Sequence, residues 1–506
     1  MTAYLATFAY TEKMITTPVY TTDQIREIER IAFSSVPSYV LMERAGRTIS
    51  DLTISEIPQG KNRVLILAGP GNNGGDAYIA ASNLKSIGFQ VTVVSVGESQ
   101  KQGSDAEKAR EAWIESGGTI SDSNIDFDAH DLIIDGLLGI GLSRDIEHDI
   151  YQLITKANRS ELPIISIDIP SGLDSENGDI RGICIHATHT VTFLGYKIGL
   201  HTGCGPDYCG EIHLDLLGLS RRTEPDGIGY LIGEDILRHA LPPRRPTSNK
   251  GNHGHVAVIG GAFGMTGAAT LAARAALNLG SGRVTIGFLS EPPVADWIQP
   301  ELMLKTATEC KDISSLNCIC IGPGLGMSQE ALEILNEVLE KDIPVVLDAD
   351  AINLVATHEK TRILLTNRTS PTVLTPHPGE AARLIGCEIH EVQKNRILHA
   401  CNLSQEFDAD VLIKGAGSVC ALSDGSWFIN TSGNPGLASA GMGDALTGII
   451  GALIAQGAHS HAALLAGVHL HGLAADELVK NGIGPIGITA SETIKQARLI
   501  LNRQHQ

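Results

Sequence analysis

The sequence GNPGLASAGMGDALTG, residues 433–448, carries the strongest structural signal in this chain. A glycine-rich turn runs directly into an apolar helix, where pairs of hydrophobic residues recur every four positions from Ala445 to Ile454. Gly441 and Gly443 have no Cβ, so the backbone can turn tightly and approach a ligand closely. The free N–H groups and the positive dipole end of the first helical turn attract anions. This stretch therefore predicts a phosphate-binding helix start.

One carboxylate, Asp444, stands at the junction between this turn and the helix. A bound phosphate repels a carboxylate, so its presence there needs a chemical reason. Deprotonation of a hydroxyl group that attacks phosphorus is one such reason. The alternative is that Asp444 only caps the helix, as aspartate often does. We interpret Asp444 as a general base.

The composition restricts the classes of function. The chain has 506 residues and a net charge of −19, with no basic block, which argues against a nucleic-acid partner. The nine cysteines are scattered, which fits a reduced cytosolic setting, and we expect Cys318 and Cys320 to face opposite sides of a strand. The start of the chain lacks the features of a secretory signal, and no segment offers 18 uninterrupted apolar residues. We expect a cytoplasmic homo-oligomer without a membrane partner.

The first half of the chain shows three apolar strands, each followed by a glycine turn with polar residues. RVLILA (63–68) precedes GPGNNGGD and a helix from Ala77 to Leu84, while DLIID (131–135) and PIISID (163–168) each end in an aspartate. Ligands of parallel sheets bind at the carboxyl edge of the strands, so these residues indicate a common site. A helix with a capping box begins at Thr21, and residues 1–20 form a loose arm in this interpretation.

The second half repeats this pattern of apolar strands followed by turns with glycine and polar residues. Strand ends carry Asp348 and Asp350, His377 and Lys414, and they converge with Asp444 in a parallel α/β arrangement, which predicts a nucleotide-dependent enzyme. The four histidines between His459 and His471 are predicted to belong to a packed helix. The polar, turn-rich segment 218–229 marks a boundary, and we divide the chain into domains 1–223 and 224–506.

The motifs GPGNNGGDAYIAA, DGLLGIGL and DIPSGLD resemble the NAD(P)HX epimerase domain of the bifunctional NAD(P)H-hydrate repair enzymes. The resemblance implies a Rossmann-like three-layer α/β/α domain, with Asp168 as the catalytic acid/base and Lys197 near a phosphate. It implies a potassium site at Asn73, Asp135 and Ser171, and oxygen-only ligands suit such a hard cation. Ile140 departs from the small or hydroxyl residue usual in the family. The implied substrate contacts are Asn72, Asn73, Gly74, Gly75, Asp76, Gly139, Ile140, Gly141, Leu142, Ser143, Arg144, Asp145 and Asp168.

The motifs PELM, GPGLG, LDADAINL, TPHPGEAARL, IKGAGSV and AGMGD resemble the ADP-dependent NAD(P)HX dehydratase domain of the same family. The resemblance implies a ribokinase-like α/β domain in which ADP phosphorylates the C6 hydroxyl group of the hydrated nucleotide. Phosphate then leaves, because it is a far better leaving group than hydroxide, and Mg²⁺ is expected to neutralise the phosphates. The implied substrate contacts are Ala268, Gly324, His377 and Asp444. The implied ADP contacts are Lys414, Gly415, Ala416, Gly417, Ser418 and Gly443.

Two rival interpretations share some of these signals. A ribokinase-like kinase of a small alcohol would have the same fold and GxGD turn, but it would release a stable phosphorylated product. A protein- or lipid-binding module that has lost catalysis would explain the first domain alone. The presence of Asn73, Asp135, Asp168 and Ser171 together argues against that second alternative.

Overall fold

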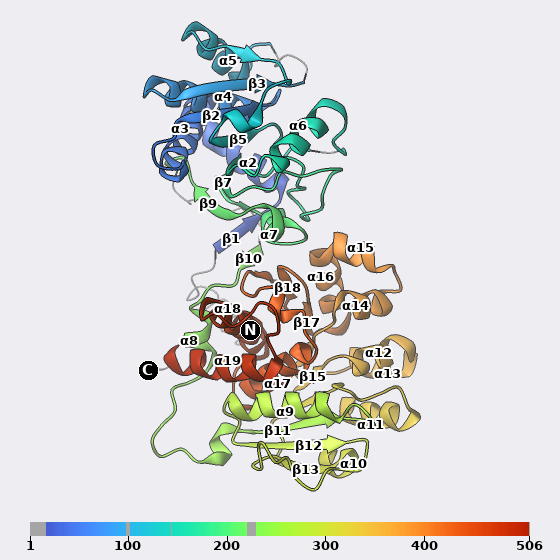
Figure 1. The fold of residues 1–506 in the computed structure, drawn as a ribbon. Helices are drawn as coiled ribbons and strands as arrows, with labels where there is room; N and C mark the ends of the chain where they lie inside the picture. The colour runs from blue at the N-terminus through green and yellow to red at the C-terminus, as the bar shows by residue number, and fades with distance from the viewer. Residues whose placement is uncertain (1–16, 98–101, 143, 220–228, 505–506) are drawn as a thin grey trace. The chain divides into compact units, whose positions relative to one another are not determined.

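The computed structural model describes residues 17–97, 102–142, 144–219 and 229–504 (Figure 1). Its contacts divide the chain into two compact units, and the boundary lies between Ile228 and Gly229. We name them the N-terminal unit, from Pro18 to Ile228, and the C-terminal unit, from Gly229 onward. The predicted boundary at 223/224 falls within residues 220–228, outside the described part of the chain.

The N-terminal unit is a parallel seven-stranded sheet with helices on both faces, ordered β4-β3-β2-β5-β6-β7-β9. Helices α3, α4 and α5 pack over one face, and α6 covers the other. This confirms the predicted three-layer α/β/α organisation. The strands are β2 (Arg63–Ala68), β3 (Gln90–Ser95), β4 (Ile120–Ser121), β5 (Leu132–Gly136), β6 (Ile164–Ile167), β7 (His189–Phe193) and β9 (Glu211–Asp215). The helices are α2 (Thr22–Phe33), α3 (Ser38–Glu56), α4 (Asn72–Ser86), α5 (Asp105–Glu115), α6 (His148–Arg159) and α7 (Gly205–Tyr208).

Three features of this unit refine the sequence-based expectations. The capping box of α2 is confirmed, because Thr21 Oγ1 accepts from the Gln24 N–H while Gln24 Oε1 accepts from the Thr21 N–H. The helix expected from Ala77 already begins at Asn72, so the asparagine pair forms its first turn. The expectation of a loose arm through residue 20 was wrong at its end. Thr17–Tyr20 forms strand β1, which pairs in parallel with β8 (Tyr196–Lys197).

The C-terminal unit is built on a sheet of order β13-β12-β11-β14-β15-β16-β17-β18-β19-β10. The strands from β13 to β17 are parallel, and β18 runs antiparallel to both of its neighbours. The strands are β10 (Gly229–Leu231), β11 (His255–Gly260), β12 (Arg283–Phe288), β13 (Met303–Thr306), β14 (Cys318–Ile321), β15 (Val345–Leu347), β16 (Thr372–Leu374), β17 (Asp410–Ile413), β18 (Ser418–Ala421) and β19 (Trp427–Asn430).

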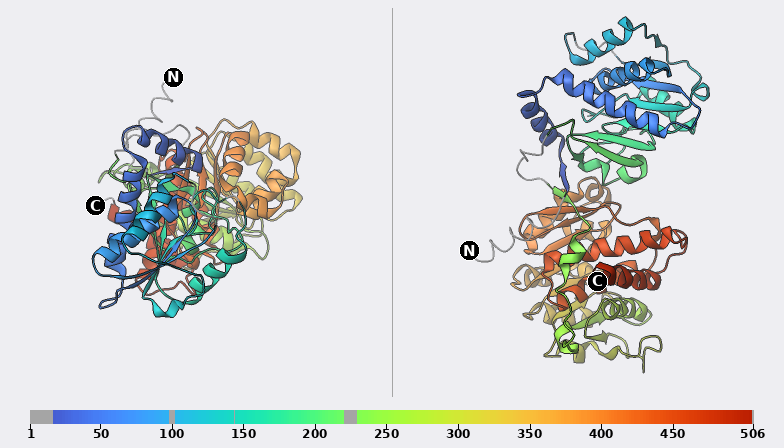
Figure 2. Two further views of the ribbon diagram at one scale, coloured as in Figure 1. Left: turned by 90° about the horizontal axis from the view of Figure 1, so that it is seen from above. Right: turned by 90° about the vertical axis from the view of Figure 1, so that its left-hand side faces the viewer.

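Two helical layers enclose this sheet, each with its own hydrophobic core (Figures 1 and 2). One layer contains α8 (Ile236–Ala240), α9 (Thr266–Asn278), α17 (Met442–Ala455), α18 (Ser460–Lys480) and α19 (Ala490–Gln504). The other contains α10 (Ala307–Lys311), α11 (Gln329–Leu339), α12 (Asp350–Thr357), α13 (Glu359–Thr366), α14 (Pro378–Ile385), α15 (Ile389–Lys394) and α16 (Arg396–Phe407). The layered α/β fold predicted for this half is thereby confirmed.

Two apolar segments of this unit have buried, structural roles. Helix α18 is long and apolar enough to cross a membrane, but 78% of its apolar window is buried, as in the core helix of a globular domain. The prediction of a packed helix there is confirmed. The expectation for the two cysteines of β14 was wrong, because residues two apart in a strand share a face. Cys318 and Cys320 both belong to the core under α17, and both are free thiols.

Candidate functional site

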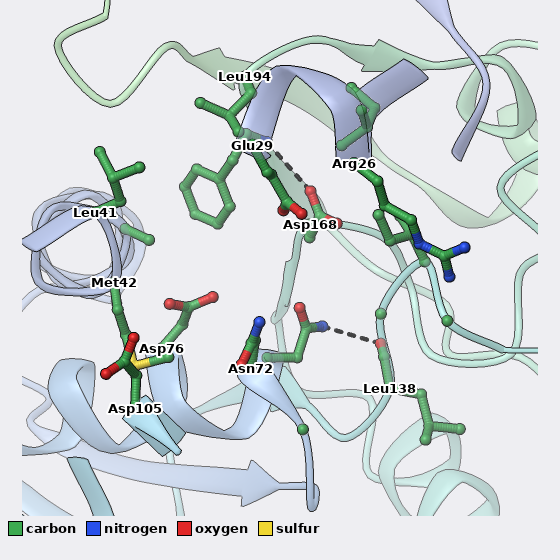
Figure 3. A pocket seen from close by; sticks show the side chains of 18 of the residues that line it. Arg26, Glu29, Leu41, Met42, Asn72, Asp76, Asp105, Leu138, Asp168 and Leu194 are labelled. Atoms are coloured by element: carbon green, nitrogen blue, oxygen red, sulfur yellow. Dashed lines mark hydrogen bonds between the residues drawn. The ribbon is translucent and has the colours of Figure 1, made fainter. Parts of the chain in front are cut away.

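The N-terminal unit contains a cavity of about 670 Å³ at the carboxyl ends of its strands (Figure 3). Residues of α2, α3 and the start of α4 line it, together with the turns that follow β5, β6 and β7. This position agrees with the edge at which ligands of parallel sheets bind. The predicted residues that line it are Asn72, Asn73, Asp76, Gly139, Ile140, Gly141, Leu142, Arg144 and Asp168.

Asp168 follows β6 directly and has a left-handed backbone, with φ of 65°. Such a conformation is costly for a residue other than glycine and is concentrated at functional sites. Its Oδ1 accepts from the Phe193 N–H at 3.2 Å and from the ammonium group of Lys197. Within the described residues, Oδ2 accepts no hydrogen bond. The carboxylate is therefore anchored through one oxygen while the other is free to exchange a proton.

Lys197 belongs to this arrangement, although the resemblance placed it only near a phosphate. The structure buries its side chain to 1% exposure. Besides Asp168, its ammonium group donates to Thr192 Oγ1 at 2.9 Å and to the Phe193 carbonyl at 2.8 Å. Because a buried charge needs a partner, the contact with the carboxylate keeps this ammonium group in place.

Two further carboxylates share the cavity. Burial raises the pKa of Asp76 well above its usual value, and the nearby Asp168 and Glu29 add to this shift. Burial also raises the pKa of Glu29, again with a contribution from Asp168. In Figure 3, Glu29 on α2 points toward Asp168, and Asp76 on α4 also lines the cavity. Glu29 was missed in the sequence because it sits in an ordinary amphipathic helix with no motif around it.

The three predicted cation ligands lie together beneath this cavity. Ser171 Oγ donates to Asp135 Oδ1 at 2.6 Å and contacts the Leu138 carbonyl at 3.2 Å. Asn73 Nδ2 donates to that same carbonyl at 2.9 Å. Asp135 is fully buried, and burial raises its pKa. Its hydrogen-bond donors among the described residues are neutral groups, namely two serine hydroxyls and two backbone N–H groups.

Three of the predicted substrate contacts among the described residues do not line the cavity. Gly74 packs against the Gly69 backbone, where a Cβ would lie 2.0 Å from the carbonyl oxygen, and Gly75 packs against Met42. Asp145 is exposed and contributes to the electrostatic environment of Arg181. Ser143 lies outside the described residues. The two glycines therefore have a packing role in this structure.

In the C-terminal unit, the buried Asp348 and the partly buried Lys414 form an ion pair at the ends of β15 and β17. Lys414 Nζ lies 2.6 Å from Asp348 Oδ1, and the hydroxyl groups of Thr375 and Thr447 donate to the same carboxylate. Burial raises the pKa of Asp348, but Lys414 together with the hydrogen bonds from Thr447 and Thr375 lowers this pKa overall. A Cβ at Gly443 would lie 3.2 Å from Lys414 Nζ. Asp348 thus positions the lysine next to the start of α17.

Asp444 occupies the third position of α17. The helix is capped by Gly441 with φ of 85° and has no side-chain cap. Within the described residues, the Asp444 carboxylate accepts no hydrogen bond, so the capping alternative does not hold. Burial raises its pKa to about 6, with Asp348 adding to the rise and Lys414 opposing it. A carboxylate with these properties can accept a proton near neutral pH.

His377 and Glu380 lie at the start of α14, close enough to Lys414 to interact with it electrostatically. His377 caps α14, since its Nδ1 accepts from the Gly379 N–H at 3.0 Å. Glu380 Oε1 lies 3.2 Å from His377 Nε2, and burial raises the pKa of Glu380 to about 7. Lys414 and Asp348 both contribute to the electrostatic environment of these two residues. Sequence reasoning found His377 from its position after a strand but missed Glu380.

The remaining predicted residues of this unit fall into two turns. Gly324, with φ of 58°, lies close to Ala268, because a Cβ on the glycine would be 3.2 Å from that of the alanine. In the turn after β17, Ser418 Oγ contacts both the Gly415 N–H and the Gly415 carbonyl, and Arg396 donates to the Ala416 carbonyl at 2.7 Å. Gly417 also belongs to this turn, with φ of 61°.

Known proteins resemble this chain along most of its length. Residues 38–199 match the family model described as YjeF-related protein N-terminus, and residues 256–497 match that of NAD(P)H-hydrate dehydratase. The chain is 40% identical to the bifunctional NAD(P)H-hydrate repair enzyme Nnr of Escherichia coli over 96% of this chain and 94% of the relative. It is 36% identical to that of Coxiella burnetii over 96% of this chain and all of the relative. The crystal structure of the Bacillus subtilis ADP/ATP-dependent NAD(P)H-hydrate dehydratase, co-crystallised with ATP/Mg²⁺, matches 55% of this chain and all of its own, with a TM-score of 0.48 and 29% identity.

Proposed function

The chain belongs to the family of bifunctional NAD(P)H-hydrate repair enzymes, and on this premise we propose which of its residues carry out each reaction. The enzyme epimerises the hydrates of NADH and NADPH and dehydrates them back to the reduced nucleotide. The residue assignment rests on a feature that the two carboxylates, Asp168 and Asp444, have in common. Each lies at the carboxyl end of a parallel sheet with at least one oxygen free of hydrogen bonds from the described protein.

For epimerisation, Asp168 acts as the acid and the base at the C6 hydroxyl group. It gives a proton to the departing oxygen, which leaves as water while the ring nitrogen lone pair stabilises the cation that remains. Water returns to the opposite face of the ring and gives a proton back to the carboxylate. Lys197 is a positioning residue, because it holds Oδ1 and leaves Oδ2 to exchange the proton. The loop at 139–145 and the first turn of α4 hold the nucleotide phosphates and sugar.

A potassium ion at Asn73, Asp135 and Ser171 fits the donor chemistry on two grounds. All the available side-chain ligand atoms are oxygens, which suits an alkali cation. Asp135 is fully buried and its described donors are neutral, so a bound cation would compensate a charge that the protein otherwise leaves without a counter-ion. The ion would supply positive charge and would fix the turn after β5. The serine hydroxyl must then redirect its proton away from Asp135.

For dehydration, Asp444 accepts the proton of the C6 hydroxyl group as that oxygen attacks the terminal phosphorus of ADP. The bond from phosphorus to the bridging oxygen breaks, and AMP leaves. The C6–phosphate bond then breaks with help from the ring nitrogen, and loss of a proton from the neighbouring carbon restores the dihydropyridine ring. Lys414 and the backbone N–H groups at Gly443 and in the turn 415–418 stabilise the phosphates. Ala268, Gly324 and His377 contact the hydrated nucleotide.

Mg²⁺ would be held here chiefly through the nucleotide phosphates. Asp348 and Glu380 already bond to protein groups, so few carboxylates remain as direct ligands. Mg²⁺ usually keeps several waters and few protein ligands at such sites, so the residues fit this mode of binding. The ion would neutralise the phosphate charge during transfer.

The experiment that tests these roles follows the absorbance of the dihydropyridine ring when the purified protein meets the S-hydrate with ADP, and then with ATP. The proposal expects the absorbance to recover together with equimolar AMP and phosphate when ADP is the donor. A stable phosphorylated product without absorbance recovery would instead identify a kinase of a small alcohol and overturn the proposal.

A further inference from the structure

A cluster of two histidines and two glutamates lies at the edge of the N-terminal sheet and is not used in either reaction. His189 is the first residue of β7, while Glu211 and His213 belong to β9. His189 pairs in register with Glu211, so the alternation of side chains along a strand places all three on one face of the sheet. Glu56, the last residue of α3, lies beside them. We call these four residues the β7–β9 cluster.

The distances in this cluster are those of ligands around one metal ion. His189 Nδ1 lies 3.2 Å from His213 Nε2 and 4.0 Å from Glu211 Oε2, and His213 Nε2 lies 3.9 Å from Glu211 Oε1. Two nitrogens that each lie about 2.0–2.1 Å from a tetrahedral zinc ion are roughly 3.3 Å apart. The nitrogen pair already has this separation, and the glutamate needs only a small rotation to reach the same point.

The second imidazole nitrogen of His189 supplies an independent indication. Its Nε2 lies 3.3 Å from Glu56 Oε2, and the His189 side chain is only 12% exposed. A histidine that binds a metal through one nitrogen almost always donates the other N–H to a carboxylate or carbonyl, which fixes the ring and raises its basicity. In a site of this kind Glu56 would orient His189, while the exposed Glu211 would leave room for a water molecule as the fourth ligand.

We propose that His189, His213 and Glu211 bind a divalent transition-metal ion of the zinc class, with Glu56 orienting His189. Two imidazoles and one carboxylate suit Zn²⁺ and Co²⁺ better than Mg²⁺ or K⁺. The ion would tie the edge strand β9 to β7 and the end of α3. The role of the ion is structural rather than catalytic, because its ligands lie where β7 and β9 begin. Asp168 follows the carboxyl end of β6, at the other edge of the parallel sheet.

The alternative arrangement is a hydrogen-bonded chain, in which His213 Nε2–H donates to His189 Nδ1 and no ion binds. The metal site and the hydrogen-bonded arrangement predict different numbers of metal ions bound by the full-length chain. After removal of metals with a chelator, equilibrium dialysis against Zn²⁺ measures this number for the wild type and for the double variant His189→Ala/His213→Ala. We expect the double variant to bind one ion fewer.

Two controls make this result specific. His148 is an exposed histidine 3.6 Å from Glu147, so His148→Ala removes a comparable surface pair outside the cluster and should leave the stoichiometry unchanged. Glu211 is 71% exposed, so Glu211→Gln tests the site with little risk to folding. Epimerisation by each variant verifies that the unit is folded. Glu56→Gln should keep the site but weaken Zn²⁺ binding by about 10- to 100-fold.

Cobalt provides a second readout. Co²⁺ at the proposed site should give visible absorption bands of a tetrahedral ion in the wild type, and these bands should be lost in the double variant and in Glu211→Gln. Equal stoichiometry and equal spectra in the wild type and the double variant would overturn the proposal. An equal loss of binding in His148→Ala would do so as well, because it would show general surface binding.

Discussion

At the scale of single residues, the fold prepares the two carboxylates that we propose as catalytic groups in different ways. Asp168 is anchored at one oxygen by a buried lysine and a backbone N–H, and its strained backbone directs it into the cavity. Asp444 has no such anchor among the described residues, and burial near Asp348 raises its pKa to about 6. The fold therefore fixes the position of Asp168, whereas it raises the proton affinity of Asp444.

The substitution Asp168→Asn tests the first of these roles. The asparagine side chain would fill the same space but could not exchange a proton, so we expect epimerisation to slow by at least about 100-fold. Interconversion of the R and S hydrates, followed by chromatography, measures this. Dehydration of the S-hydrate should be unchanged. Asp51→Asn, at an exposed position of α3, is the matched control and should leave both activities intact.

The raised pKa of Asp444 predicts the pH dependence of dehydration. The general base must be ionised, so the rate at saturating substrates should fall tenfold per pH unit below about pH 6 and reach a plateau above it. Initial rates of NADH formation between pH 5 and 8 measure this profile. A profile that stays flat down to pH 5 would show that another group takes the proton.

The pH dependence of stability provides a second check on the same pKa shift. In the native state Asp444 binds its proton up to about pH 6, whereas in the unfolded chain it loses it near its usual value of 3.8. Ionisation in the native state is therefore unfavourable, and stability contributed by the protonated form is lost as the pH rises through 6. Asp444→Asn should unfold at a higher temperature than the wild type at pH 8 but not at pH 3.5.

The sequence allowed some site residues to be predicted and hid others for physical reasons. Asp168 and Asp444 could be predicted because Asp168 directly follows a strand and Asp444 directly follows a glycine turn. Ligands of parallel α/β sheets bind at such positions. Lys197 could not be assigned, because its burial depends on packing that no local pattern encodes. The pKa of Glu380 likewise arises from burial in the folded unit.

At the scale of elements, the start of α17 depends on how closely this helix approaches its neighbours. A Cβ on Gly448 would lie 2.0 Å from the Ala272 carbonyl oxygen of α9, and one on Gly451 would lie 2.2 Å from Cys320 Sγ. The two glycines therefore set the distance at which α17 packs, and thereby the position of Asp444. The apolar periodicity of α17 was visible in the sequence, but the need for glycine at these two positions was not.

Gly448→Ala tests this packing. The added methyl group meets backbone atoms that cannot rotate away, so α17 and α9 must separate, and we expect a loss of about 1–3 kcal/mol in the free energy of unfolding. Thermal or urea unfolding of the C-terminal unit measures it. Gly267→Ala in α9 is the control, because a Cβ there meets no atom within 4 Å and alanine favours helix. An equal effect of both substitutions would contradict the packing argument.

Two other elements show where a sequence pattern misleads. Helix α4 begins at Asn72 because its asparagine and glycine residues serve as a helix start, although their composition is typical of a turn. Strand β1 pairs at Val19 with Tyr196 of β8, which lies far away in the sequence. Such long-range pairing leaves little signal in a four-residue segment.

At the scale of the whole molecule, each unit has its own hydrophobic cores and its own site. The cores of residues 32–217 share no member with those of residues 232–501, so each unit packs around its own sheet. The two reactions also share a nucleotide intermediate, because the S-hydrate that one site forms is the substrate of the other.

This independence predicts that two chains, each inactive at one site, complement each other in solution. Asp168→Asn alone should consume only the S-hydrate, and Asp444→Asn alone should equilibrate the hydrates without forming NADH. A mixture of the two variants with ADP should convert R-hydrate to NADH at a rate that approaches that of the wild type as the concentration of Asp444→Asn rises. NADH absorbance measures the conversion. If the mixture is no faster than Asp168→Asn alone, the S-hydrate does not pass between chains, and the two sites must exchange it within one molecule.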